Sequence, residues 1–282
     1  MVRYMLKPGP DTVTGSRRTK TWLLTLLGEA VLPTSRYVWQ GALVDSLVAL
    51  GSSTAAARQA VNRAVAEGWL SSERVGRRSR LAISELTAVQ LREGRARTMG
   101  FGSPHDWGGR WLLVALTVPE DSRSMRYHFR TQLAWLGFGS LGNGLVISPH
   151  ADNEAATLRL FASIEGPQGA YVFTDAQPAN RGPREIAAEA WDLEGLRARY
   201  EAFVERFEHM APRTPEETLA AWVELFTSWR HFPLFDPELP DSLLPADWPR
   251  TAALVLFRRR LDEWSAVALD HFRSLENPSS GS

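Results

Sequence analysis

Residues 54–83 read TAAARQAVNRAVAEGWLSSERVGRRSRLAI, and this stretch decides the fold of the first third of the chain. From about Ala55 to Glu67, apolar residues recur at the three- and four-residue spacing of a helix, which Gly68 then ends. Two short runs of strand-forming residues follow on either side of Gly76. The stretch therefore predicts a helix followed by a β-hairpin with a basic turn.

The flanking sequence supplies further helices. Apolar spacing predicts one helix over Thr19–Ala30 and a second over Trp39–Leu50, and Gly51–Thr54 reads as a stop followed by a helix cap. Ser84 is expected to cap a fourth helix that reaches about Met99. Three helices followed by a hairpin is the order of a winged helix-turn-helix, whose third helix enters the major groove of DNA.

The third predicted helix has one apolar and one polar face. Its apolar stripe consists of Ala57, Ala60, Val61, Ala64 and Val65. The opposite face carries Arg58, Gln59 and Asn62. Arginine pairs with guanine, and glutamine or asparagine with adenine, so these three residues are the candidate base readers. Arg63 lies at the flank of this face, where it would suit a phosphate.

The hairpin is strongly basic around its turn. Four arginines surround Gly76, namely Arg74, Arg77, Arg78 and Arg80, and only Glu73 opposes them. A wing of this composition can reach the phosphate backbone or the minor groove. Wing arginines would then supply affinity and salt dependence, while the third helix supplies sequence choice. The alternative is a solvated hairpin whose charges serve only solubility.

The charge of the chain divides in the same way. The 282 residues include 32 basic and 32 acidic side chains, a net charge of zero. Met1–Thr98 carries 15 Lys or Arg and 7 Asp or Glu, whereas the remainder carries 17 and 25. A segment of +8 joined to one of −8 indicates a part that faces nucleic acid and a more acidic part, although chance variation gives such a split too.

Composition sets further bounds. With 44% hydrophobic residues and 11 Trp, the chain can build a sizeable core, which argues against disorder. The absence of cysteine removes disulfides and cysteine-based metal sites, and it fits a reducing cytoplasm. No apolar run approaches the roughly 20 residues of a membrane span. The six histidines have no metal-ligand spacing, and no nucleophile elbow or P-loop is present, so we expect no metal site, no catalytic residue and no enzyme activity.

After residues 100–109, a plausible linker, the pattern changes. Strands are expected over 111–118, 144–148 and 169–174, with helices over 124–136 and 153–163 between them. This β-α-β-α-β order leaves room for one more strand and predicts a small α+β module. From Pro183 onward helices dominate, over 194–210, 215–232 and 249–275.

One motif in this module is a decoy. Residues 137–142, GFGSLG, match the dinucleotide pattern G-x-G-x-x-G. That site needs the pattern after a strand and at the start of a helix. Here the glycines follow a helix and precede a strand, so the segment is interpreted as a turn.

Several ordered motifs resemble the PaaX family, the phenylacetate-degradation repressors. They are EGWLSSERVGRRS at 67–79, WGGRWLL at 107–113, WLGFGS at 135–140, WDL at 191–193, FDPELP at 235–240 and LLPADWP at 243–249. The resemblance runs from about Ser16 to Phe272. It implies a multidomain α+β chain with a winged helix-turn-helix, a central ferredoxin-like (Cas2-like) module and a helical C-terminal domain. The corresponding ranges are a flexible arm at 1–18, then 19–99, 110–182 and 183–276.

The resemblance also implies a function. Family members are homodimeric repressors of a catabolic operon, and they release double-stranded operator DNA when they bind an aryl-acyl-CoA thioester, typically phenylacetyl-CoA. The expected partners are therefore DNA, a second copy of the chain and an acyl-CoA effector, with no cofactor and no membrane.

Trp229, Arg230 and His231 are the candidate effector residues. The aromatic ring could hold an aryl group, and Arg230 or His231 could meet a phosphate or carbonyl. The alternative is a packed helix with Arg230 paired to an acid. The arginine run at 258–260 could bind CoA phosphates, or it could be a solvated face.

Two other functions compete with a ligand-responsive repressor. One is a constitutive or architectural DNA-binding protein without an effector. The other is a metal-dependent nuclease, which the Cas2 resemblance raises. Such nucleases hold the metal with an Asp at the end of the first strand, whereas the strand ending at Val118 has no carboxylate, and Glu120 and Asp121 lie beyond it. A nuclease is therefore the least favoured of the three.

Overall fold

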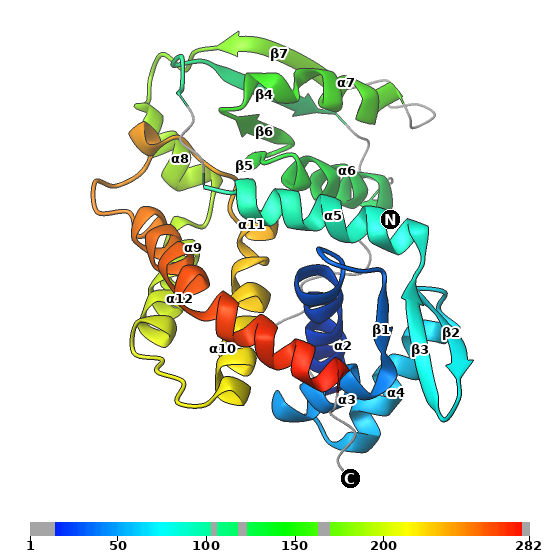
Figure 1. Cartoon of the computed structure of the whole chain (residues 1–282). Helices are drawn as coiled ribbons and strands as arrows, with labels where there is room; N and C mark the ends of the chain where they lie inside the picture. The colour runs from blue at the N-terminus through cyan, green and yellow to red at the C-terminus, as the bar shows by residue number, and fades with distance from the viewer. Residues whose placement is uncertain (1–14, 103–105, 118–122, 163–169, 278–282) are drawn as a thin grey trace. The chain divides into compact units, whose positions relative to one another are not determined.

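The computed structural model describes residues 15–102, 106–117, 123–162 and 170–277. They form two compact units, each discontinuous in sequence (Figure 1). The first unit contains the described residues up to Gly100, Val204–His231, and the described residues from Leu254 onward. The second contains the described residues of Phe101–Phe203 together with Phe232–Ala253. The division into an N-terminal arm and three domains, which the sequence predicts, stays a prediction.

The N-terminal part of the first unit has the element order of a winged helix. The elements are α2 (Gly15–Thr25), the π-helical turn η1 (Leu26–Val31), β1 (Tyr37–Trp39), α3 (Gln40–Ala49), α4 (Thr54–Ala66), β2 (Leu70–Val75), β3 (Arg78–Ile83) and α5 (Glu85–Gly100). The three strands form an antiparallel sheet in the order β1-β3-β2. Three helices and a hairpin therefore follow one another as predicted.

Two details of this part differ from the prediction. The first helix continues through a π-helical turn, in which five of the six residues are buried, Leu26 and Leu27 among them with no exposed surface. Trp39, expected to begin the second helix, instead ends the three-residue strand β1, which pairs with β3 so that Tyr37 lies opposite Ala82. Such a short strand is stabilised by its partner and has no periodic signal of its own.

Helices from the C-terminal part of the sequence complete the first unit. They are α10 (Pro215–Trp229) with the adjoining parts of α9 (Leu193–Glu208) and α12 (Arg250–Glu276). The carboxylate of Glu224 on α10 accepts a hydrogen bond from Trp22 Nε1 at 2.9 Å and pairs with Arg18 at 2.8 Å. Its other oxygen pairs with Arg206 at 2.9 Å. The side chain of Glu224 thus links α10 to both α2 and α9.

The second unit contains a four-stranded antiparallel sheet. Its elements are β4 (Trp111–Leu116), α6 (Arg123–Trp135), β5 (Gly139–Gly142), β6 (Leu145–Ser148), α7 (Glu154–Ala162) and β7 (Ala170–Ala176). The spatial order β5-β6-β4-β7 with β-α-β-β-α-β connectivity is ferredoxin-like. Alternate residues of β4, such as Leu112 and Val114, form one core with Phe129 and Leu133 of α6.

The additional strand is β5, and it corrects the interpretation of residues 137–142 as a turn. Gly137 adopts a φ of 81° at the turn itself, but Gly139–Gly142 pairs with β6. A Cβ at Gly139 would lie 2.5 Å from the ring of Trp191, so this glycine permits close packing. No helix begins there, as a dinucleotide site requires.

The remaining elements of the second unit include two short helices that the sequence did not indicate, α8 (Pro183–Ala190) and α11 (Phe232–Phe235). Around them, Tyr200 donates a hydrogen bond to the buried carboxylate of Asp236, and Arg250 Nη1 lies 3.8 Å from the same carboxylate. Burial raises the pKa of the Tyr200 phenol far above its usual value. The hydroxyl therefore stays protonated and serves as a structural donor.

Candidate nucleic-acid interface

Helix α4 is oriented by its cap and its apolar stripe. The side chain of Ser53 accepts a hydrogen bond from the backbone N–H of Ala56 at 3.2 Å, which satisfies one of the free donors at the start of the helix. Ala57 and Val61 have no exposed surface, and Ala64 has 2%. Because these residues face the core, the opposite side of α4 faces solvent, as the sequence predicts.

All four predicted residues of the third helix lie together on this outer side. Arg58, Gln59, Asn62 and Arg63 are exposed, and with Ala55, Ala56 and Ala66 they line an open, shallow depression that we call the reader face. The alanines keep the surface low between the polar side chains. A helix with such a face can approach base edges closely and present amide and guanidinium donors to them.

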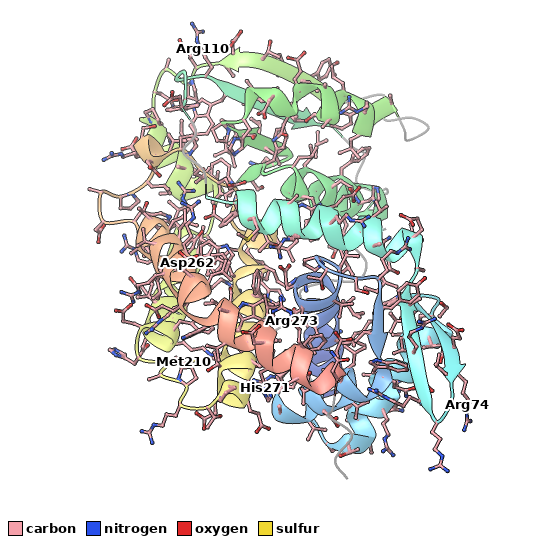
Figure 2. All side chains as sticks on the ribbon, in the orientation of Figure 1. Arg74, Arg110, Met210, Asp262, His271 and Arg273 are labelled. Atoms are coloured by element: carbon pink, nitrogen blue, oxygen red, sulfur yellow. The ribbon has the colours of Figure 1, made fainter. Side chains whose placement is uncertain are left out.

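The wing, the hairpin of β2 and β3, turns at Gly76 and Arg77. Val75 pairs with Arg78, and Gly76 has a φ of 63°. Positive φ at the first position of a two-residue hairpin turn favours glycine there. Arg74 lies on the hairpin near its turn (Figure 2), and its Nε donates to the carbonyl of Gly76 at 3.2 Å. Arg77 is exposed at the turn, and no ion pair of its guanidinium is found among the described residues.

The other two wing arginines are held by intramolecular contacts. Arg78 lies over the ring of Trp39, 4.1 Å from its centroid, and donates to the backbone carbonyl of Glu276 at 3.1 Å. Arg80 forms an ion pair with Glu73 at 2.8 Å, and this hydrogen bond and charge raise the pKa of Arg80. The wing therefore offers Arg74 and Arg77 to a ligand more freely than Arg78 and Arg80, a distinction that the sequence did not give.

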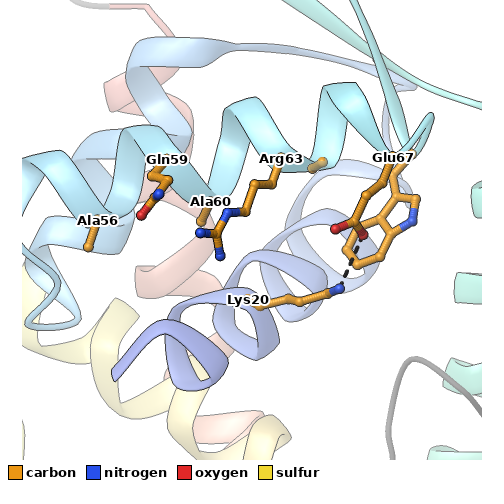
Figure 3. Close-up of a pocket in the computed structure, with 8 residues that line it drawn as sticks. Lys20, Ala56, Gln59, Ala60, Arg63 and Glu67 are labelled. Carbon is orange, nitrogen blue, oxygen red and sulfur yellow. Dashed lines mark hydrogen bonds and ion pairs between the residues drawn. The ribbon is translucent and has the colours of Figure 1, made fainter. Parts of the chain in front are cut away.

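A second hollow adjoins the reader face and contains a basic residue that the sequence analysis missed. Lys20 of α2 lines it opposite Gln59 and Arg63 of α4 (Figure 3). Its only sequence signal was its place among the excess of basic residues in the first 98 positions. The spacing of apolar residues in α2 gave no reason to single it out.

The three candidate effector residues do not share one surface. Trp229 has no exposed surface and stacks on Phe257, with ring centroids 4.7 Å apart. Arg230 is half-buried, and its Nη1 donates to the hydroxyl of Thr25 at 3.2 Å. Burial lowers the pKa of Arg230 to about 10. His231 is half-buried and follows the end of α10.

Arg230 lines a small depression. It does so together with Thr25, Gly28, Glu29 and Arg95, at the point where the π-helical turn passes α5 and α10. The hydrogen-bond acceptor of Arg230 is a hydroxyl, whereas the packed-helix alternative expected an acid. The volume of this depression is only about 10 Å³, and an aromatic contact between a ligand and Trp229 would require the core to repack.

Two arginines of the run at 258–260 join α12 to the end of α9. Arg259 pairs with Glu208 at 2.8 Å, and this hydrogen bond and charge lower the pKa of Glu208. Arg260 Nε donates to the carbonyl of Phe207 at 3.0 Å. Their contacts support the alternative of a structural face over a CoA-phosphate site.

The positions that bear on a nuclease lie partly outside the described residues. Strand β4 ends at Leu116, and Glu120 and Asp121 fall in the undescribed segment 118–122. Within the described part of the chain, no three His, Asp or Glu residues lie close enough to hold a metal ion. The same residues include no helix that is long and apolar enough to cross a membrane.

Comparison with known proteins gives three consecutive matches along the chain. A family model described as PaaX-like protein matches residues 18–87. The PaaX protein central Cas2-like domain matches residues 104–187, and the PaaX-like protein C-terminal domain matches residues 191–274. The central match covers the ferredoxin-like sheet, and the C-terminal match contains α9, α10 and most of α12.

Two individual proteins are also similar. The transcriptional repressor PaaX of Escherichia coli (strain K12) is 29% identical over 236 residues, which is 79% of this chain and 73% of that protein. The uncharacterized protein Rv0674 from Mycobacterium tuberculosis has a similar fold, with a TM-score of 0.61 at 20% identity. That match covers 89% of this chain and 96% of the other.

Proposed function

The chain belongs to the PaaX family, and from this membership we propose that it is a transcriptional repressor that binds double-stranded DNA through α4 and the wing. The observation that carries the proposal is the reader face. Four polar side chains from one helix lie exposed together, beside a hairpin whose turn carries basic residues. This is the pairing of groove reader and backbone contact that winged helices use.

The two parts of the interface have different roles. Arg58, Gln59 and Asn62 would meet base edges in the major groove and determine sequence choice. Arg74 and Arg77 would meet phosphates, which supply most of the affinity and make it depend on salt. The name of the similar Escherichia coli protein, transcriptional repressor PaaX, supports this function.

The finer proposal concerns regulation. We propose a homodimer that binds an operator of a catabolic operon of the phenylacetate type and releases it on binding an aryl-acyl-CoA thioester. Release would follow if the effector binds more tightly to a dimer whose two α4 helices no longer match the half-site spacing. The guanidinium of Arg230, which has the hydroxyl of Thr25 as its acceptor, is the candidate contact for an anionic group of the effector.

One experiment tests both levels. The duplex upstream of the chain's own gene is labelled, and binding is measured by fluorescence anisotropy with and without phenylacetyl-CoA, with free coenzyme A as the control. We expect binding that weakens with salt and that phenylacetyl-CoA, but not coenzyme A, reduces at least tenfold. A chain that binds no duplex even at low salt would contradict the DNA-binding function itself.

A constitutive DNA-binding protein is the second candidate. The observation that favours it is the burial of Trp229, whose ring has no exposed surface and stacks on Phe257. It predicts the same DNA binding with no response to any acyl-CoA thioester. A footprint that is unchanged across a panel of acyl-CoA thioesters would select this candidate over the ligand-responsive repressor.

A further inference from the structure

A groove of about 130 Å³ lies between α2 and α4, beside the reader face. Its lining residues are Lys20 from α2, then Ala56, Gln59, Ala60, Arg63, Ala64, Glu67 and Trp69. Three alanines at four-residue spacing lie on one row of α4, and Gln59, Arg63 and Glu67 lie on the next. Because alanine side chains are short, those of Gln59, Arg63 and Glu67 project beyond them. Figure 3 shows the Arg63 side chain running from α4 toward α2.

Lys20 reaches across this groove and is held there by an acid. Its Nζ lies 3.2 Å from Glu67 Oε2 and 4.2 Å from the ring centroid of Trp69 (Figure 3). The side chains of Lys20 and Glu67 are 41% and 46% exposed, so solvent and ligands can reach both. Trp69 is buried and is one of the residues that line the groove.

The groove and the reader face are neighbours that share a wall. Ala56, Gln59 and Arg63 line both hollows. A helix in the major groove is flanked on each side by a sugar-phosphate strand, so a backbone that follows the reader face passes this wall. The volume is below the roughly 300 Å³ at which small-molecule pockets begin, but it exceeds the space of a single water.

We propose that the groove takes a phosphate of the DNA backbone, with Lys20 and Arg63 as its ligands, and that Glu67 is an internal counter-ion which the phosphate displaces from Lys20. The proposal rests on the DNA-binding function and adds Lys20, which lies outside the reader face and the wing, to the residues that contact DNA. Since Glu67 carries the same sign as the phosphate, it opposes binding. Removing the charge of this acid should therefore tighten DNA binding, and the gain should depend on Lys20.

The test is a double-mutant cycle on the full chain. Affinity for a random-sequence 30-base-pair duplex is measured by anisotropy across a salt series for the wild type, K20M, E67Q and K20M/E67Q. E67Q should bind about two- to fivefold more tightly, the range of an exposed charge pair. K20M should bind more weakly, with a salt slope reduced by about 0.9, the contribution of one phosphate contact. In the K20M background, E67Q should change affinity less than twofold.

A matched control separates this site from net charge. E93Q removes an exposed acid of α5 away from the groove, and it should leave affinity nearly unchanged. Thermal unfolding of each variant checks folding, which an exposed ion pair affects little. Weaker or unchanged binding by E67Q would overturn the proposal, as would an equal gain with and without Lys20. If the wild type itself binds no duplex, the proposed DNA-binding function is wrong as well. That outcome differs from the failure of this site alone, in which the wild type still binds DNA.

Discussion

The guanidinium of Arg78 lies over the ring of Trp39, with its central carbon 4.1 Å from the ring centroid. The same side chain donates to the carbonyl of Glu276 at the end of α12, at 3.1 Å. Arg78 thus joins the wing to β1 and to a helix about 200 residues further along the chain. An arginine that looks like a phosphate ligand in the sequence is also part of the structural framework of the wing.

Arg78→Ala should therefore lower stability as well as DNA affinity. A cation–π contact and a hydrogen bond near the surface together contribute about 1 kcal/mol, which chemical denaturation can measure. Arg78→Lys keeps the charge and should recover part of the stability. A stability equal to that of the wild type in Arg78→Ala would show that the contact with Trp39 contributes nothing.

Arg77→Ala should reduce DNA affinity without a change in stability. Arg77 is exposed at the hairpin turn, so its loss removes a phosphate contact and no packing. We expect weaker binding to all sequences and a salt slope that is shallower by about 0.9. Arg74→Ala should behave similarly. The control is Arg92→Ala on α5, and a change in the preference for one base in Arg77→Ala would contradict the role of Arg77.

Asn62→Ala should change sequence preference and leave the salt slope unaltered. Asn62 is exposed on the reader face, where an amide can bind an adenine through two hydrogen bonds. Losing such a contact costs about 1–3 kcal/mol of discrimination at one base pair. A panel of single-base operator variants measures it. Equal losses across the whole panel would indicate that Asn62 contacts the backbone.

Gly144→Ala should destabilise the ferredoxin-like sheet more than Gly142→Ala. Both glycines have positive φ, 83° and 84°. A Cβ at Gly144 would lie 2.4 Å from the backbone oxygen of Leu116, whereas nothing lies within 4 Å of one at Gly142. We expect a loss of about 1 kcal/mol for Gly142→Ala from the backbone conformation alone, and about 3 kcal/mol for Gly144→Ala. Equal losses in urea unfolding would contradict the steric argument.

Arg230→Met should abolish stabilisation by the acyl-CoA effector. Methionine keeps much of the apolar volume and removes the charge. If phenylacetyl-CoA binds the wild type, it should raise the free energy of unfolding by about 2.7 kcal/mol at a concentration of 100 times its Kd. Arg230→Met should lose this stabilisation. Arg259→Ala, whose arginine is already paired with Glu208, is the matched control and should retain it. Retention by Arg230→Met would place the effector elsewhere.

The sequence predicts the local architecture well where one face of an element is buried. The stripe through Ala57, Val61 and Ala64 defines both the bounds of α4 and its outer face, so the four reader residues follow from it. The wing is predicted because Gly76 marks the turn between two strand-forming runs. In both cases, the information lies within a few residues.

What the sequence does not predict depends on distant partners. The strands β1 and β5 are short and pair with neighbours that their own residues do not indicate. Lys20 becomes part of a site only because α2 packs beside α4, whose lining residues lie 36 or more positions further along the chain. Arg78 and Arg80 look equivalent to Arg77 until Trp39 and Glu73 are placed beside them. Periodicity cannot show such pairings.

Glu224 has a consequence for synthesis of the protein. Its hydrogen bond with Trp22 joins residues separated by 202 positions. At about 5–20 residues per second, a ribosome needs about 10–40 seconds to add that length of chain. During this interval the carboxylate of Glu224, the partner of the Trp22 indole and the Arg18 guanidinium, has not yet been synthesised. The newly made N-terminal helices therefore remain incompletely covered until α10 emerges from the ribosome. The N-terminal part of the first unit is therefore among the first parts of the protein to be translated and among the last to complete its packing.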